Sequence, residues 1–256
     1  SVLRDGCHVA TVGLEELDKE RLVSLMIGHN LEERRINTRD SSLLGDTILE
    51  LSDVGYSGKL RDISFSVRRG EIFGVLGLVG SGRNELAKIL YGMIPPDRGD
   101  IYVKGEKARL RNPLEAIRKN LSYVPDDRKA HGILPNLSVE TNIVFSVLYR
   151  LVNWVFMIKR KLVRELYDYY QEKLNIRVNT REQVITELSG GNQQKCVLSK
   201  CLARANDIII LNEPTRGIDV GAKFEIYQIL LHISQEGKTL VVFSSELPEL
   251  TNLCDR

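Results

Sequence analysis

The sequence predicts an α/β fold whose central parallel sheet is covered by helices on both faces. Three apolar runs show no polar alternation, as is typical of strands buried on both faces, and they span residues 72–76, 208–211 and 240–243. Other stretches alternate apolar and polar residues or follow a Pro-Pro-Asp-Arg-Gly turn, which predicts an antiparallel β subdomain over residues 48–54, 61–67 and 99–103. The chain therefore combines both kinds of sheet.

Helices are expected between these strands. The spacing of apolar residues predicts them over residues 85–91, 113–120, 139–151, 160–173 and 222–234. Several lie between the antiparallel strands and the last two parallel strands, so we expect a helical lobe over about residues 113–187. With 256 residues, of which 43% are hydrophobic, the chain is long enough to bury a full core. One domain over residues 43–256 accounts for these elements.

A glycine-rich loop joins the first parallel strand to the first helix. It reads Gly77-Leu-Val-Gly80-Ser81-Gly82-Arg83-Asn84, and its G-x-x-x-x-G frame between a strand and a helix is typical of a phosphate-binding P-loop. In an intact P-loop, a lysine reaches the β- and γ-phosphates and a serine or threonine hydroxyl binds Mg²⁺. Arg83 and Asn84 stand at those positions, so we expect phosphate binding to survive better than hydrolysis. The alternative is a glycine turn that only packs a helix on a strand.

The nucleotide-binding candidates extend on both sides of this loop. Glu85 follows it directly, and Tyr56 precedes the strand that leads into it, where an aromatic ring can stack on adenine. Because the chain has nine tyrosines, this last assignment depends on position alone. The full candidate set is Tyr56, Gly77, Gly80, Ser81, Gly82, Arg83, Asn84 and Glu85.

A second glycine loop opens a later helix. Leu188-Ser189-Gly190-Gly191-Asn192-Gln193 places a hydroxyl and bare backbone N–H groups at the positive end of a helix, where they can hold a phosphate. The apolar run 208–211 follows, and then Asn212-Glu213-Pro-Thr-Arg-Gly-Ile-Asp219. In this order and spacing, the segments resemble the signature loop, Walker B strand and D-loop of an ABC-type ATPase. The resemblance implies a P-loop NTPase core of ABC-ATPase type that binds ATP.

The resemblance also reveals departures at positions that carry chemistry in this family. The Walker B strand usually ends in Asp-Glu, whereas this chain has Asn212-Glu213 and so lacks one charge at the metal. Residues 126–129, Asp-Asp-Arg-Lys, stand where a glutamine loop is expected, and a serine replaces the switch histidine, whose charge it cannot supply. We therefore expect Mg²⁺ to be bound weakly or not at all. Glu213 and the switch position Ser245 are weak candidates for catalysis. Asn84 and Asp126 are weak candidates for binding the metal.

Longer segments narrow the resemblance to one group of ABC ATPases. Four of them are Gly-Leu-Val-Gly-Ser-Gly-Arg at 77–83, Val-Pro-Asp-Asp-Arg-Lys at 124–129, Leu-Ser-Gly-Gly-Asn-Gln-Gln-Lys at 188–195 and Ser-Ser-Glu-Leu-Pro-Glu at 244–249. Together they are similar to the second nucleotide-binding domain of the tandem ATPases that energise bacterial monosaccharide importers of the ribose, galactose and xylose type. Membership implies two cassettes in one polypeptide that pair head to tail, each P-loop facing the partner's signature loop.

The same resemblance implies the partners and the location. They are the other cassette of the polypeptide, membrane permease subunits and, indirectly, a periplasmic or lipid-anchored sugar-binding protein, with the ATPase on the cytoplasmic face of the bacterial cell membrane. Two alternatives remain: an independently active ATPase, which the substitutions disfavour, and a soluble ABC-type protein of DNA repair or translation. Proteins of that last kind usually carry coiled-coil inserts or basic arms. With 36 basic and 34 acidic residues, the chain shows no bias toward nucleic acid.

The first 42 residues resemble the tail of a preceding cassette followed by a linker; a private N-terminal appendage is the alternative. An Asp-Gly turn between short apolar stretches predicts a β-hairpin within residues 2–11, and residues 14–26 predict an amphipathic helix. Residues 32–42 are polar without periodicity. Because a cassette of this type continues past its switch loop into a hairpin, we expect a fragment truncated at its C-terminus. We expect residues 2–11 to dock at the sheet edge beside residues 240–243, within the same molecule or by exchange with a neighbour.

One apolar stretch, residues 143–158, is too short to span a bilayer and is interrupted by Arg150 and Asn153. We expect it to lie in the helical lobe. Residues 154–157, Trp-Val-Phe-Met, are predicted to fill the core of that lobe, and a docking surface for a membrane subunit is the alternative.

Overall fold

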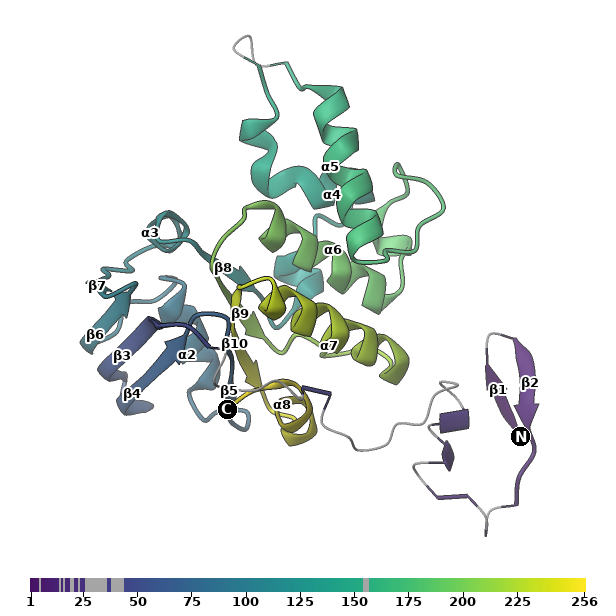
Figure 1. Ribbon diagram of the computed structural model, residues 1–256, viewed down its shortest axis with the longest axis horizontal. Helices are drawn as coiled ribbons and strands as arrows, with labels where there is room; N and C mark the ends of the chain where they lie inside the picture. The colour runs from purple at the N-terminus through teal and green to yellow at the C-terminus, as the bar shows by residue number, and fades with distance from the viewer. Residues whose placement is uncertain are drawn as a thin grey trace.

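The computed structural model describes residues 1–4, 6–13, 15, 17, 18, 21, 22, 24, 25, 36, 37, 44–153 and 157–256. Its main body combines a parallel sheet, an antiparallel sheet and a helical lobe (Figure 1). This confirms the predicted fold class. The bounds of the predicted strands agree with the structure to within about two residues.

The parallel sheet has the strand order β5-β10-β9-β8, in which β5 is Ile72–Leu76, β10 is Thr239–Ser244, β9 is Ile208–Asn212 and β8 is Leu121–Val124. Every residue of β9 and β10 is buried, which explains why their sequences are continuous apolar runs. Because the strands are parallel, the loops that leave their carboxyl ends meet at one edge of the sheet, where ligands bind in open α/β sheets.

The antiparallel sheet has the order β4-β3-β6-β7, formed by β3 (Thr47–Tyr56), β4 (Leu60–Arg68), β6 (Arg98–Val103) and β7 (Glu106–Lys107). Helix α2 (Arg83–Leu90) packs between the two sheets. Its buried residues Leu86, Ala87, Ile89 and Leu90 share one apolar cluster with residues of β3, β6, β9 and β10. This packing fixes the helix that follows the glycine-rich loop.

The helices divide between the lobe and the faces of the parallel sheet. They are α3 (Pro113–Arg118), the π-helical turn η3 (Arg128–Gly132), α4 (Val139–Val144), the 3₁₀ helix η4 (Phe145–Arg150), α5 (Arg160–Lys173), η5 (Ile185–Glu187), α6 (Gly190–Ala203), α7 (Val220–Gln235) and α8 (Leu247–Leu253). A second apolar cluster joins α4, α5, α6 and α7 to the parallel sheet. Since β8 lies in that sheet, the lobe proper is shorter than the expected range of 113–187.

The predicted helix over 139–151 is two elements, α4 and η4. The carbonyl of Ser146 accepts a hydrogen bond from Arg204 Nη1, and the Ser146 hydroxyl donates to the carbonyl of Lys200. The Ser146 carbonyl, which could accept a hydrogen bond within a continuous helix, is therefore bound by Arg204 instead. This tertiary context favours the tighter 3₁₀ geometry in the second half.

The N-terminal hairpin forms as predicted, but its docking site is wrong. Strands β1 (Val2–Arg4) and β2 (Cys7–Ala10) pair antiparallel, with Gly6 at φ +77° in the turn. They make a separate two-stranded sheet that lies apart from the main body (Figure 1). Residues 240–243 have no free edge, because β10 pairs with β5 on one side and with β9 on the other.

Much of the predicted helix 14–26 and of the linker 32–42 lies outside the described residues. Of the described residues in that range, 21, 22, 24 and 25 are α-helical, residue 15 is in a 3₁₀ turn, and residues 17 and 18 are not helical, so the helix prediction is wrong at those two positions. In the linker, Asn37 is buried, and its side-chain amide donates to the carbonyl of Leu253 and to Asp255 Oδ1 at 3.0 and 2.8 Å. The linker is therefore anchored at the end of α8 at this point.

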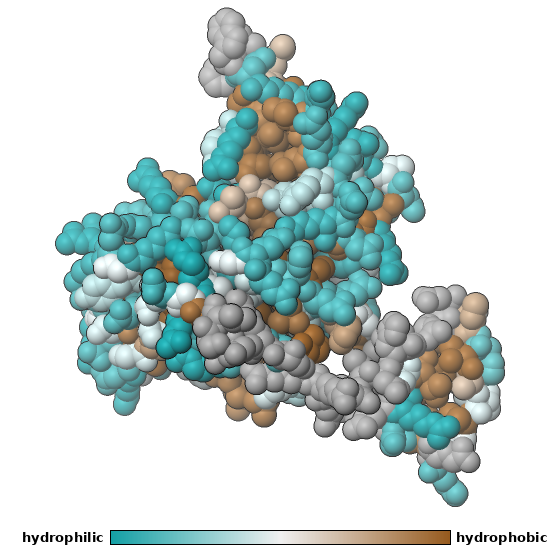
Figure 2. Space-filling model, viewed as in Figure 1, coloured by the Kyte–Doolittle hydropathy of each residue, from teal (hydrophilic) through white to brown (hydrophobic). Residues whose placement is uncertain are grey.

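The prediction that residues 154–157 fill the lobe core is wrong for Met157, whose exposed fraction is 64%; residues 154–156 lie outside the described residues. Figure 2 shows an apolar area on the helical lobe. The lobe's exposed large apolar residues are Leu137, Phe145, Tyr149, Met157, Ile158, Leu162 and Tyr169. In the described part of the chain, no helix has the length and apolar character needed to cross a membrane.

Candidate nucleotide-binding site

The glycine-rich loop connects β5 to α2, and its glycines serve different purposes. Gly80 and Gly82 both have φ +90°, a conformation that favours glycine. A Cβ on Gly80 would meet nothing within 4 Å, whereas one on Gly82 would lie 2.7 Å from the Leu60 side chain. Gly77 donates its backbone N–H to the carbonyl of Ser244, and a Cβ there would lie 2.5 Å from Ser81 Oγ. The loop is thus built for a bare, closely packed backbone.

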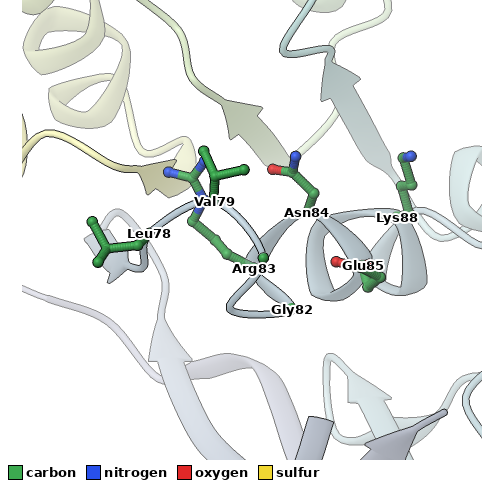
Figure 3. Close-up of a pocket in the computed structure, with 8 residues that line it drawn as sticks. Leu78, Val79, Gly82, Arg83, Asn84, Glu85 and Lys88 are labelled. Carbon is green, nitrogen blue, oxygen red and sulfur yellow. The ribbon is translucent and has the colours of Figure 1, made fainter. Parts of the chain in front are cut away.

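A hollow lies over this loop and the first turns of α2 (Figure 3). The predicted residues Gly80, Gly82, Arg83, Asn84 and Glu85 all contribute to its lining. The remaining lining residues are Leu78, Val79 and Lys88. The structure therefore brings the predicted P-loop residues together around one opening at the amino end of a helix.

Arg83 does not extend freely into solvent. Its side chain is 5% exposed, and Nη2 forms an ion pair of 2.5 Å with Glu213 Oε1, whose side chain is 8% exposed. Nε and Nη1 of Arg83 are buried and have no hydrogen-bond partner among the described residues. The arginine at the lysine position is therefore held against Walker B, with part of its fork still able to bind an anion.

Glu213 receives two further hydrogen bonds, both from Ser245. The serine hydroxyl donates to Oε1 at 2.7 Å and its backbone N–H donates to the same atom at 3.2 Å. Glu213 also has φ +50°, an uncommon value for a residue with a side chain, of the kind that recurs at functional sites. Three donors on one oxygen hold the carboxylate in place.

Two amide side chains occupy the expected metal position. Oδ1 of Asn84 and Oδ1 of Asn212 are buried without hydrogen-bond partners among the described residues. Asn212 Nδ2 donates to the hydroxyl of Tyr123 at 3.2 Å. Burial raises the pKa of Tyr123, and the hydrogen bond from Asn212 opposes that shift.

These residues offer two buried, unpartnered amide oxygens to a Mg²⁺ ion. Neutral amide oxygens are acceptable Mg²⁺ ligands, but the usual Walker B carboxylate is absent. Over the described residues, no cluster of three or more histidine, cysteine, aspartate or glutamate side chains is arranged to hold a metal ion.

Tyr56 and Glu85 lie at the margin of the site. Tyr56 ends β3 and is partly buried against the apolar cluster around α2, and it does not line the hollow. Lys59 Nζ forms an ion pair of 2.7 Å with Glu85 Oε1, and this hydrogen bond lowers the pKa of Glu85. The pair joins the turn after β3 to α2. Stacking of Tyr56 on adenine stays a prediction.

The signature loop is a capped helix start. Ser189 precedes α6, and its hydroxyl accepts hydrogen bonds from the backbone N–H of Asn192 at 3.4 Å and from the Asn192 side chain at 3.1 Å. Gln193 Nε2 donates to the carbonyls of Ile185 and Leu188, which ties the loop to the element before it. These contacts hold Leu188 to Gln193 in one rigid turn.

The two signature glycines are required by packing. A Cβ on Gly191 would lie 2.6 Å from the Cβ of Ala222 on α7, and one on Gly190 would lie 2.6 Å from Arg128 Nη2 and 3.2 Å from the carbonyl of Gly217. Asp219 caps α7, where its Oδ1 accepts a hydrogen bond from Ala222 N–H at 2.9 Å. The signature loop and the D-loop are therefore adjacent and in close contact.

The sequence did not reveal the role of Glu249. This side chain is 1% exposed and accepts hydrogen bonds from the hydroxyls of Ser244, at 2.5 Å, and Thr215, at 2.7 Å. Burial raises the pKa of Glu249, and the hydrogen bonds from Ser244 and Thr215 oppose that shift. The carboxyl thus joins the end of β10 to the turn after Walker B. Its two partners are next to Ser245 and two residues after Glu213, so it helps to hold both in position. Its position in Ser-Ser-Glu-Leu-Pro-Glu was the only available signal.

Comparisons with known proteins agree with this geometry. The ABC transporter family model matches residues 60–216. Over its whole length the chain is 40% identical to the ribose import ATP-binding protein RbsA of Clostridium tetani, of which it covers 50%. It is 38% identical to the galactose/methyl galactoside import ATP-binding protein MglA of Treponema pallidum, of which it covers 51%. The chain thus spans about half the length of these relatives.

Solved structures share the fold. A nucleotide-free ATP-binding cassette from an ABC transporter superposes with a TM-score of 0.70 at 20% identity, covering 82% of this chain and 85% of that one. A cassette in its ADP conformation gives 0.71 with the same identity and coverage. The family match extends over more than half of the chain, and the P-loop, Walker B end and switch position meet at one sheet edge. This chain belongs to the ABC transporter family.

Proposed function

We propose that this chain is one ATP-binding half of a tandem ABC ATPase that energises the import of a monosaccharide. The names of its relatives, which are import ATP-binding proteins for ribose and for galactose or methyl galactoside, support this reading. In this proposal residues 43–256 form the nucleotide-binding domain. Residues 1–42 are the tail of the preceding cassette and a linker.

The half's own site binds nucleotide phosphates but contributes little hydrolysis. Bound ATP supplies the γ-phosphoryl group for transfer to water. The residues that would hold it are the backbone of the loop at 77–82 and the unpartnered part of the Arg83 fork. The observation that carries the proposal is the convergence of Arg83 and Ser245 on one oxygen of Glu213. That carboxylate is neutralised by a buried arginine, and Ser245 stands at the position of the switch histidine.

The signature loop serves a catalytic site on the partner cassette. Ser189 and the N–H groups at the start of α6 form an anion-binding helix end, and that end is fixed by Gln193 and by close packing on α7. In a head-to-tail pair this end faces the γ-phosphate held by the partner's P-loop. The hydroxyl and amides would then stabilise charge that develops during hydrolysis.

The remaining partners follow from the same reading. Permease subunits would dock on the apolar face of the helical lobe, where Phe145, Tyr149 and Met157 are exposed. The ATPase would then sit peripherally on the cytoplasmic face of the bacterial membrane. A sugar-binding protein would act indirectly, through the permease.

The test compares two substitutions in the full-length two-cassette protein. Ser189→Arg places bulk and charge where the γ-phosphate docks, and should lower the ATPase rate by about 100-fold, the size of a lost transition-state donor. Glu213→Gln should leave the rate within about twofold, because Glu213 is not the base for the measured turnover. Gln235→Arg, at the exposed C-terminal end of α7, is the control. An unchanged rate in folded Ser189→Arg protein, or a collapse in Glu213→Gln, contradicts the proposal.

A further inference from the structure

The segment at 126–129, where a glutamine loop is expected, places one arginine between the D-loop and the signature loop. We propose that Arg128 is a positioning residue that locks these two loops into a single rigid face, and that this lock is needed for hydrolysis in the partner cassette's site. The inference rests on the proposed function, in which that face completes the partner's site. It assigns a role to one residue of the segment Val-Pro-Asp-Asp-Arg-Lys at 124–129 that the sequence left without one.

Arg128 lies at the junction between the parallel sheet and the helical lobe. Asp127 caps the turn η3 that begins with Arg128, since its Oδ1 accepts hydrogen bonds from the N–H groups of Lys129 and Ala130 at 2.9 and 3.0 Å. The carbonyl of Gly132, the last residue of the turn, accepts a hydrogen bond from Lys200 Nζ on α6. The base of the arginine is therefore fixed to the helix that carries the signature loop.

The guanidinium brackets the D-loop backbone. Nη1 donates to the carbonyl of Arg216 at 2.6 Å, and Nη2 donates to the carbonyl of Gly217 at 2.9 Å. Gly217 has φ +65°, so the chain turns sharply at the point that the fork holds. A planar fork with two parallel donors matches two successive carbonyls, which the single ammonium of a lysine cannot do.

The same guanidinium touches the signature loop. A Cβ on Gly190 would lie 2.6 Å from Nη2 of Arg128. Because this nitrogen is already committed to Gly217, it has little freedom to move aside. Gly190 therefore allows the contact among three segments: the turn η3, the D-loop and the first turn of α6. Burial lowers the pKa of Arg128, yet an arginine remains charged at neutral pH, so a cation lies directly behind the phosphate-binding turn.

Two consequences follow for the partner's site. The backbone N–H groups at the start of α6 are held at one distance from Asp219 and the rest of the D-loop. The positive charge of Arg128 also adds to the potential at the helix end. Loss of the arginine should reduce turnover more than nucleotide binding, because preorganised donors act mainly in the transition state.

The experiment uses the full-length two-cassette ATPase with Mg-ATP. Arg128→Gln should lower kcat about tenfold or more and change KM for ATP less than about threefold. Arg128→Lys should have a rate between those of Arg128→Gln and the unmodified protein, because lysine keeps the charge but lacks the planar pair of donors that binds the carbonyls of Arg216 and Gly217. Lys129→Gln changes the exposed neighbouring side chain and is the control with unchanged rate. Thermal melting of each variant separates a positioning effect from a loss of folding.

A double-mutant cycle tests whether Arg128 and Gly190 act together on kcat. Gly190→Ala should lower kcat sharply when Arg128 is present and by a smaller factor in the Arg128→Gln background, because the clash partner has then been removed. Equal factors in both backgrounds, or a full kcat in Arg128→Gln, overturn the inference. Ser189→Arg is measured in parallel. If it abolishes hydrolysis while Arg128→Gln does not, only this inference fails; if Ser189→Arg is fully active, the proposed function fails and takes the inference with it.

Discussion

The P-loop and the signature loop are both glycine-containing turns that open a helix, yet their surroundings differ. The charged residue of the P-loop, Arg83, is paired inside the protein with Glu213. The signature loop contains no charged residue, and its shape is fixed by Ser189, Gln193 and the packing of two glycines. A phosphate-binding helix end is therefore common to both. The two loops differ in the groups beside the helix end. At the P-loop, Arg83 and Glu213 pair with each other, whereas the signature loop, having no charged residue, has no such ion pair.

In the proposed function, this comparison explains why one site loses catalysis while the other keeps its role. Hydrolysis needs a free base and a metal carboxylate, and Glu213 is engaged by Arg83 and Ser245 whereas Asn212 carries no charge. A signature loop needs only a rigid helix start with a hydroxyl and N–H groups. Four predictions test how far this distinction holds, beginning with the largest effect.

Arg83→Met should destabilise the protein by about 3 kcal/mol, because it leaves a buried carboxylate without its cation. Arg83→Met combined with Glu213→Leu should recover most of that loss, since both charges are then removed. Denaturant unfolding of each variant gives the free energies. Lys88→Met, one turn further along α2 and exposed, is the matched control and should stay within about 0.5 kcal/mol. If Arg83→Met costs no more than this control, Arg83 is not an internal counterion.

Gly191→Ala should cost about 2 kcal/mol in unfolding free energy, because the added Cβ would lie 2.6 Å from the Cβ of Ala222. Ala222→Gly removes that partner atom, so the two changes should be strongly non-additive when their unfolding free energies are compared. Additive losses would show that Gly191 is required for its bare backbone and not for helix packing. The signature loop would then resemble the P-loop more closely than we argue.

Asn212→Asp restores the Walker B carboxylate and should tighten Mg-dependent nucleotide binding to this half by about tenfold, near 1.4 kcal/mol. Titration of a fluorescent ATP analogue with and without Mg²⁺ measures the change, and the same variant in EDTA is the control. Hydrolysis by this half should remain low, because Glu213 is still paired with Arg83. Restored turnover at this site would show that the missing carboxylate, and not the ion pair, had silenced it.

Glu249→Gln tests the buried carboxyl that binds Ser244 and Thr215, next to Ser245 and close to Glu213 in the chain. Its expected effect is a change in how the stability of the protein depends on pH. The pKa of Glu249 is raised above its ordinary value of 4.5, chiefly by burial, so the folded state holds this proton more tightly than the unfolded chain. The native protein should therefore lose stability relative to the Gln variant as pH rises above 4.5 through the raised pKa. Chemical denaturation between pH 4 and pH 8 measures this difference. If the native protein instead gains stability relative to the Gln variant as pH rises, the assignment is wrong.

Several elements could be read from the sequence because their determinants are local. Strand 208–212 is buried at every residue, as its apolar run 208–211 predicted. Strand 72–76 was predicted from a similar run, although it is the edge strand of the sheet and only partly buried. The glycine frame of 77–82 requires a turn between a strand and a helix. The β-hairpin near the N-terminus followed from its Asp-Gly turn alone. The break between α4 and η4 did not, because it depends on hydrogen bonds that Ser146 makes with Lys200 of α6 and with Arg204 at its end.

The docking of the hairpin failed for a similar reason. The order of strands in a sheet cannot be inferred from any single segment of the sequence. In the structure, β10 lies inside the sheet and both of its edges are paired. The exposure of Met157 likewise depends on how the lobe packs, since a single apolar residue in a connecting segment is as compatible with a surface as with a core.

By itself the sequence determined the fold class, the order of the phosphate-binding and Walker B segments, and the identity of the replaced residues. Only the tertiary structure decided what the replacements do. Arg83 and Glu213 are 130 positions apart, and Arg128 and Gly217 are 89 apart, so neither contact has a local signature. Chain topology brings each pair together at the edge of the parallel sheet, and burial then determines their chemistry. A charge removed from water must find its partner inside the protein.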